Sequence, residues 1–126
     1  MTTRFPDLEA YIRAPDLALL QSRLTIELGV EAWQTLGQQI SGHFSAGGNR
    51  AEIVIQDRAY KNYCSVWVKH NVTPWPTDLD FAKWLATQLH SEVRCSQSGW
   101  IENEPLDQPT LWYRLRGTDI DQVRWD

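Results

Sequence analysis

Three histidines and two cysteines are the side chains of this 126-residue chain best suited to metal or nucleophilic chemistry. The histidines, His43, His70 and His90, share no metal-ligand spacing, and the cysteines, Cys64 and Cys95, do not form a C-x-x-C pair. The sequence therefore predicts neither a metal site nor a bound cofactor.

Cys64 together with a histidine and an acid could form a nucleophilic set. It lies, however, on the apolar side of a strand predicted over residues 63–69, where a thiol acts as a small hydrophobic side chain. In a reducing compartment both cysteines are expected to stay buried as free thiols. We therefore expect this chain not to be an enzyme.

Paired carboxylates and one glycine-bearing segment have simple structural explanations. Asp78 and Asp80 stand where a helix is predicted to begin, and Asp119 and Asp121 stand in a predicted turn. Neither pair supplies the number of ligands that a calcium loop needs. Residues 45–50 (SAGGNR) lack the Lys-Ser/Thr ending of a phosphate loop, so we interpret them as a turn.

A polar loop over residues 97–109 carries the clearest functional signal. Its carboxylates could steer the chain toward a basic protein surface, with a tryptophan as the apolar anchor. Two further tryptophans, from the neighbouring loop and helix, could extend this surface. The alternative interpretation is a solvated loop, with those tryptophans sealing the edge of the core. The predicted partner-binding residues are Trp75, Trp84, Trp100, Glu102, Glu104 and Asp107.

Composition narrows the possible partners and the compartment. A net charge of −4 argues against nonspecific nucleic-acid binding, which needs clustered lysines and arginines. No apolar run is long enough to span a bilayer, and the amino-terminal residues do not resemble a secretory signal. We expect a cytoplasmic protein without a membrane partner. Seven tryptophans are too many to bury in a chain of this size, so some should lie at the surface.

The elements that must position these residues follow from hydrophobic periodicity. We predict a short helix over residues 6–13, a helix from Pro15 to Leu28 ended by Gly29, and a strand over residues 38–44. Two strands follow, at 51–57 and 63–69, with Trp67 on the outer side of the second.

The second half of the chain begins with the strongest helix signal. Thr77 is the predicted N-cap, and the apolar face consists of Phe81, Leu85 and Leu89. Strands are predicted at 92–96, 111–116 and 122–125. The prediction is a single α+β domain over residues 1–126, with helices on one face of a mostly antiparallel sheet of about five strands. Its element order is α-α-(β)-β-β-α-β-β-β.

One resemblance rests on this layout over residues 51–126. A small, acidic, tryptophan-rich domain with a strand hairpin, the helix DFAKWLATQL and a closing LWYRLRG…VRW pair resembles the immunity proteins of bacterial contact-dependent or polymorphic toxin systems. The resemblance implies tight binding to a cognate toxin domain, often through an acidic patch that opposes a basic nuclease cleft. It rests on no motif, so no binding residue is carried over.

Three functional hypotheses follow. The first is a non-enzymatic protein-binding module that neutralises a bacterial toxin domain. The second is a small-molecule-binding or enzymatic domain with a tryptophan-lined pocket that uses Arg114, Arg116 or His70 as polar groups. The third is a homodimer that buries the surplus tryptophans at its interface.

Overall fold

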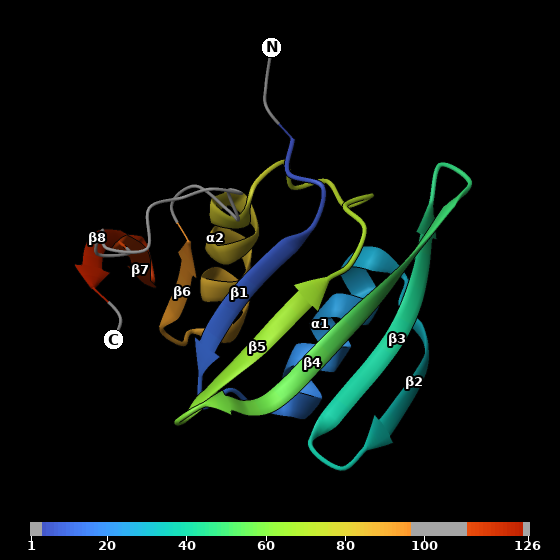
Figure 1. The fold of residues 1–126 in the computed structure, drawn as a ribbon, viewed down its shortest axis with the longest axis horizontal. Coiled ribbons are helices and arrows are strands. Elements are labelled where there is room, and N and C mark those ends of the chain that lie inside the picture. The colour runs from blue at the N-terminus through green and yellow to red at the C-terminus, as the bar shows by residue number, and fades with distance from the viewer. Residues whose placement is uncertain (1–3, 97–110, 125–126) are drawn as a thin grey trace, which may run out of the picture.

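An eight-stranded antiparallel sheet and two helices make up the computed structural model, which describes residues 4–96 and 111–124 (Figure 1). The strands lie in the order β2-β3-β4-β5-β1-β6-β7-β8. The predicted α+β class with an antiparallel sheet is confirmed, but the predicted strand number and element order are wrong. The elements are β1 (Leu8–Arg13), α1 (Leu17–Leu28), β2 (Glu31–Leu36), β3 (Gln39–Ala46), β4 (Asn49–Tyr60), β5 (Tyr63–Val68), α2 (Asp78–Leu89), β6 (Val93–Ser96), β7 (Leu111–Arg116) and β8 (Asp119–Arg124).

Residues 8–13 are a strand, so the helix predicted over residues 6–13 is wrong. Leu8, Ala10 and Ile12 alternate with polar residues and are fully buried, which is the period-two pattern of a strand with one covered face. β1 lies between β5 and β6, near the middle of the sheet. Its two neighbours satisfy the backbone groups, and this tertiary pairing outweighs the modest helix preference of Leu-Glu-Ala.

α1 agrees with the prediction for residues 15–28. The Asp16 carboxylate accepts a hydrogen bond from the Leu19 N–H at 3.1 Å and caps the first turn. Gly29 closes the helix with a left-handed φ of 73°. Leu20 and Leu24 are buried, whereas Ile26 is 73% exposed because it lies off the apolar stripe.

β2 is a strand that the sequence did not predict. It is an edge strand and mostly exposed, so its residues lack the alternation of apolar and polar types that marks a half-buried strand. Ala32 has a φ of 57°, at the point where the register with β3 shifts. On β3, Gly42 has no side chain, and Val30 and Trp33 occupy the space that its Cβ would need.

α2 begins and ends as its sequence indicates. The Thr77 hydroxyl caps the helix by accepting from the Asp80 N–H, and it also donates to the Asp80 carboxylate at 2.7 Å. Phe81 and Leu85 are fully buried, and Leu89 is nearly so. The predicted N-cap and apolar face are therefore confirmed.

The carboxyl-terminal strands extend the sheet beyond the prediction. β6 and β7 fall where strands were expected, but β8 begins at Asp119 rather than at residue 122. The turn between β7 and β8 therefore contains only Gly117 and Thr118. β8 is polar and mostly exposed. Its first half therefore lacks the alternation of apolar and polar residues by which a half-buried strand is predicted from sequence.

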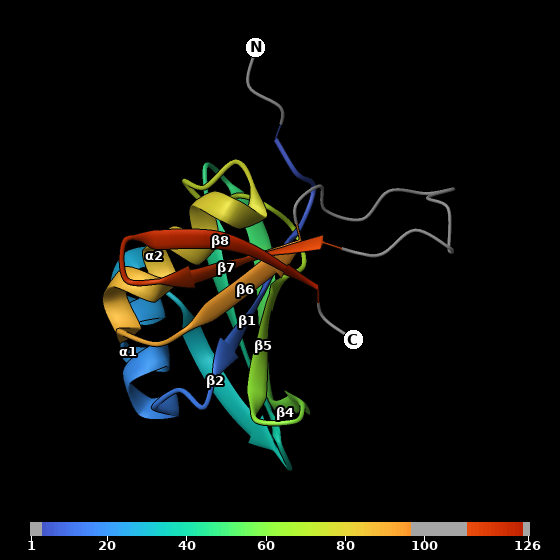
Figure 2. The ribbon, with the colours of Figure 1, turned by 90° about the vertical axis from the view of Figure 1, so that its left-hand side faces the viewer.

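The two helices lie on the same side of the sheet, as Figure 2 shows. The inward side chains of β1, β3, β4, β5, β6 and β7 form one apolar core with them. Among the described residues, neither helix is long and apolar enough to cross a membrane. The opposite side of the sheet is covered by neither α1 nor α2. The largest fully buried side chains of the core include Leu8, Ile12, Leu20, Leu24, Ile53, Val66, Phe81 and Leu85.

Candidate functional site

We call the side of β5, β1, β6 and β7 that faces away from the helices the open face. Because side chains alternate along a strand, residues next to buried positions must point to this side. The strand registers then align them in rows across the sheet, for example Tyr11 beside Arg94 and Arg94 beside Arg114. The open face consists of Glu9, Tyr11, Arg13, Tyr63, Ser65, Trp67, Glu92, Arg94, Ser96, Trp112, Arg114 and Arg116.

Glu92 is the centre of the polar contacts on the open face. Its carboxylate accepts hydrogen bonds from the Tyr63 hydroxyl, from Arg94 Nε at 3.1 Å and from Arg116 Nε at 2.9 Å. The side chain is only 7% exposed. Burial alone would raise the pKa of the Glu92 carboxyl, but the bonds from Tyr63, Arg116 and Arg94 outweigh burial and lower the pKa. Glu92 is therefore a carboxylate at neutral pH.

The neighbouring arginines are held apart by separate partners. Arg94 and Arg114 are direct cross-strand neighbours, an arrangement that like charges disfavour. Arg94 pairs with Glu92 and lies over the Tyr63 ring at 5.1 Å. Arg114 makes a two-bond contact with Asp121 on β8, at 3.0 and 2.6 Å, and the Arg114 guanidinium lowers the pKa of that carboxyl. Each guanidinium therefore has a fixed direction.

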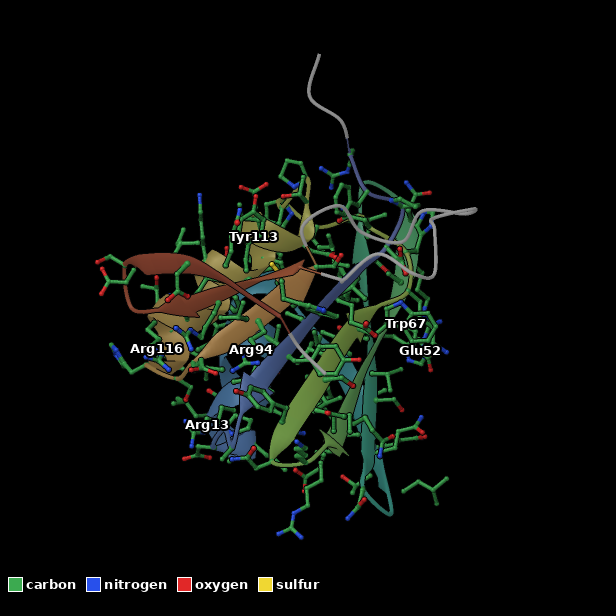
Figure 3. All side chains as sticks on the ribbon, turned by 60° about the vertical axis from the view of Figure 1, so that its left-hand side comes forward. Arg13, Glu52, Trp67, Arg94, Tyr113 and Arg116 are labelled. Carbon is green, nitrogen blue, oxygen red and sulfur yellow. The ribbon has the colours of Figure 1, made fainter. Side chains whose placement is uncertain are left out.

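Four positions of the open face carry aromatic rings: Tyr11, Tyr63, Trp67 and Trp112. Tyr11 and Trp112 meet edge to face, with ring centroids 5.8 Å apart. Trp67 is 38% exposed, and its indole N–H donates to Asp7 at 2.9 Å. Lys69 Nζ lies 5.2 Å from the Trp67 ring centroid. The sequence left open whether Trp67 is covered or exposed, and the structure places it at the surface (Figure 3).

Two of the predicted partner-binding residues lie together on the helix side of the sheet. Trp75 is 8% exposed and packs against Phe81 and Trp84, with centroid distances of 5.1 and 4.8 Å. Trp84 is half-buried in the same cluster. This burial leaves little of the Trp75 ring for a partner and matches the alternative interpretation of a side chain at the edge of the core. The other predicted residues, Trp100, Glu102, Glu104 and Asp107, lie outside the described residues.

The loop before α2 is fixed by a buried polar network. The Asn71 amide donates to the carbonyls of Phe5 and Trp75 at 2.9 and 3.0 Å. The Thr73 hydroxyl donates to the Asn71 side-chain oxygen at 2.6 Å, and Arg4 donates to the Thr73 carbonyl. These bonds satisfy the backbone of a buried loop and hold Trp75 against the helix.

The candidate nucleophiles are buried in the core. Cys64 and Cys95 are free thiols, and burial raises the pKa of each to about 12. Burial is the larger cause of each value, and a nearby carboxylate, Asp57 for Cys64 and Asp78 for Cys95, is the smaller cause. Both side chains are therefore neutral thiols at pH 7, and a neutral thiol is a poor nucleophile.

The remaining titratable residues do not gather into a ligand set. His70 and His90 are exposed, and His43 lies 4.0 Å from Glu52. In the described ranges 4–96 and 111–124, no three His, Cys, Asp or Glu side chains form a group that could hold a metal ion. Asp78 is buried at the start of α2, where it accepts a hydrogen bond from the Glu9 N–H at 3.0 Å. Its burial raises the pKa of the carboxyl to about 7.

Sequence reasoning missed the Glu92 network because the order of the strands brings its residues 63, 92, 94 and 116 together. The helix predicted over residues 6–13 also left out β1, the strand between β5 and β6. Assigned as a strand, the same residues place Tyr11 and Arg13 on the polar side of the sheet, beside the outer residues of β5. The sequence did show that Trp112, Arg114 and Arg116 alternate with apolar residues. It did not show that their strand, β7, pairs with β6. No protein-family model matches the chain, and the comparisons with curated proteins and with solved structures give no match either.

Proposed function

We propose that this chain is a non-enzymatic protein-binding module that contacts its partner through the open face. The observation that carries the proposal is a sheet face that no described helix covers and that bears the 38% exposed Trp67 together with Tyr11, Trp112 and four arginines. Tryptophan, tyrosine and arginine are the residues that most often dominate the energy of protein interfaces.

The rigidity of the open face supports the same proposal. Its rings and guanidiniums are carried by paired strands and are directed by Glu92, Asp121 and Asp7. Side chains that are already ordered lose less conformational entropy on binding, so more of the contact energy appears as affinity. The face is also mixed in polarity, as interfaces of proteins that exist both free and bound usually are.

A bacterial toxin domain is the partner that we propose. The resemblance to immunity proteins supports this class, and the net charge of −4 favours a partner with a basic surface. The open face itself carries four arginines against Glu9 and Glu92, so the charges that would meet such a surface lie outside this face. In this proposal Trp100, Glu102, Glu104 and Asp107 supply the steering charges and a further anchor. Trp67, Tyr11 and Trp112 supply the contacts that hold the complex together.

The proposal can be tested with the product of the reading frame adjacent to the gene of this chain. Calorimetry should give a complex whose dissociation constant rises at least tenfold for Trp67→Ala, since truncating an interface hot spot costs about 2 kcal/mol or more. Leu36→Ala is the matched control, because Leu36 is 82% exposed on β2, outside the open face. Equal affinities of the two variants would contradict the proposal.

The acidic loop can be tested separately in the same assay. Reversing the charges of Glu102, Glu104 and Asp107 should slow association and weaken its dependence on salt, while dissociation changes little. A faster dissociation with unchanged association would show that these carboxylates do not act as steering charges.

A further inference from the structure

An open pocket of about 450 Å³ lies at one end of the open face, where β1, α2 and β7 end and β6 begins. The residues that line this pocket include Arg13 at the end of β1 and Arg116 at the end of β7. Its lining also includes His90, Ser91 and Glu92, which connect α2 to β6. Figure 3 shows Arg13, Arg94 and Arg116 at this end of the molecule. The pocket is large enough for a small organic molecule.

The sheet register brings the two arginines to the same pocket. The Arg13 N–H donates to the Glu92 carbonyl at 2.9 Å, so Arg13 and Glu92 are neighbours across β1 and the start of β6. Val93 pairs with Leu115, which places Arg116 beside Glu92 on the other side. Arg13 and Arg116 therefore flank one buried carboxylate.

The guanidiniums are available to a ligand although Glu92 lies between them. Glu92 accepts from Nε of Arg116, so that hydrogen bond does not use the two terminal nitrogens, and the Arg116 side chain is 58% exposed. Arg13 is exposed and has no side-chain hydrogen bond or ion pair within the described part of the chain. One arginine is thus oriented by the protein, and the other is unpaired.

The local charge is positive in a protein whose net charge is negative. Arg13, Arg94 and Arg116 contribute three positive charges and Glu92 one negative charge, which leaves +2. Two groups oppose it: Asp119, which faces Arg116 across the β7–β8 hairpin, and the negative carboxyl end of α2. Asp119 is exposed and the helix end carries about half a charge, so both are weaker at the pocket than the two guanidiniums that line it.

We propose that this pocket binds a doubly charged oxyanion of the phosphate class, as the phosphate group of a small molecule. Two guanidinium groups match the oxygen geometry and the charge of such a dianion. The imidazole of His90 lies at the same pocket and can donate a further hydrogen bond. This site uses Arg13 and Arg116 rather than the aromatic residues of the proposed protein interface, so either proposal can fail alone.

The test is an NMR titration of the full chain with inorganic phosphate and with glycerol 3-phosphate at constant ionic strength. Both should produce saturable shifts of the Ala14, Ser91 and Gly117 amides and of the Arg116 Nε–H signal. Arg13→Gln should weaken binding about tenfold or more, because it removes a charged hydrogen-bond donor whose guanidinium has no partner among the described residues. Arg23→Gln is the matched control, since Arg23 is exposed on α1, away from the pocket.

Three results would overturn the proposal. The first is shifts that do not saturate or that sodium chloride reproduces at the same ionic strength. The second is equal binding by Arg13→Gln and Arg23→Gln. The third is succinate binding as tightly as phosphate, which would exclude selectivity for the phosphate class. Spectra of the free Arg13→Gln variant that overlay on the wild type away from the pocket establish that its fold is intact.

Discussion

Two pairs of tryptophans lie on opposite sides of one sheet and have different surroundings. Trp75 and Trp84 pack against Phe81 on the helix side, where an apolar core surrounds them. Trp67 and Trp112 lie on the open face among arginines, tyrosines and carboxylates. The side of the sheet, not the residue type, decides whether an indole packs in the apolar core or lies among charged and aromatic side chains.

The buried carboxyls on the two sides of the sheet also differ. On the helix side, Asp78 is buried near the core with one backbone donor, and its charged form is disfavoured. On the open face, Glu92 is also buried, but three side chains donate to it and favour its charged form. Burial raises a carboxyl pKa unless enough donors compensate for the lost water.

The largest expected effect is the loss of the helix-side indole. Trp75→Ala should lower the free energy of unfolding by about 3–5 kcal/mol, because it removes a large buried ring and leaves a cavity. Trp67→Ala should lower it by about 1 kcal/mol or less, because Trp67 is partly exposed. Urea unfolding followed by circular dichroism measures both values. Equal losses of unfolding free energy in the two variants would contradict the distinction between core-packed and open-face tryptophans.

Asp78 should make the helix side less stable as pH rises. A carboxyl whose pKa is raised to about 7 in the folded state contributes stability that is complete below its unfolded value of 3.8 and is lost as pH rises through 7. The loss between pH 5 and pH 8 should be about 2–3 kcal/mol, at 1.36 kcal/mol per unit. Asp78→Asn keeps an oxygen for the Glu9 N–H and should remove most of this loss. An unchanged pH profile would contradict the account.

Glu92 should give folding stability the opposite pH dependence, with less stability at low pH. Its pKa is lowered by the donors around it, so its stabilising effect is present above pH 4.5 and is lost as pH falls through the lowered value. Glu92→Gln should cost about 2 kcal/mol at pH 7, since it weakens hydrogen bonds to two charged arginines. The difference from the wild type should shrink below pH 4. Unfolding midpoints measured from pH 3 to pH 7 test this directly.

The smallest effect is expected at the Arg114–Asp121 pair. Asp121 is exposed, so solvent and salt screen its contact with Arg114. Asp121→Asn should leave the urea midpoint unchanged in 0.5 M salt, where the screening length is about 3–8 Å. A clear loss of stability at that salt concentration would show that the Arg114–Asp121 pair stabilises the fold as the Glu92 contacts do, and would contradict its description as a screened surface pair.

The sequence predicted the elements whose signals are local. Thr77 and Gly29 mark helix ends by their own chemistry, and the Gly47–Gly48 turn joins two strands that alternate clearly. It did not predict β1, because Leu8, Ala10 and Ile12 are read as strand residues only when neighbouring strands are known. It also missed β2, whose residues are mostly exposed and therefore carry no periodicity.

The candidate site was less predictable than the fold. Trp67 could be assigned to the outer side of β5, but whether another element covers it depends on the rest of the chain. Trp75 follows a proline in a polar loop, and the sequence left open whether it binds a partner or seals the edge of the core. The Asn71 and Thr73 side chains hold that loop against the core. The Glu92 network joins residues 63, 92, 94 and 116, and no spacing rule connects positions brought together by sheet order.

The central claim is that the open face, and not the helix side, meets the partner. The seven indole N–H signals of the protein, each assigned with a Trp→Phe variant, report on both sides in one NMR spectrum. On addition of the product of the adjacent reading frame, which we propose as the partner, the signals of Trp67 and Trp112 should shift while those of Trp75 and Trp84 stay in place. Shifts of Trp75 and Trp84 with Trp67 and Trp112 unchanged would contradict the account.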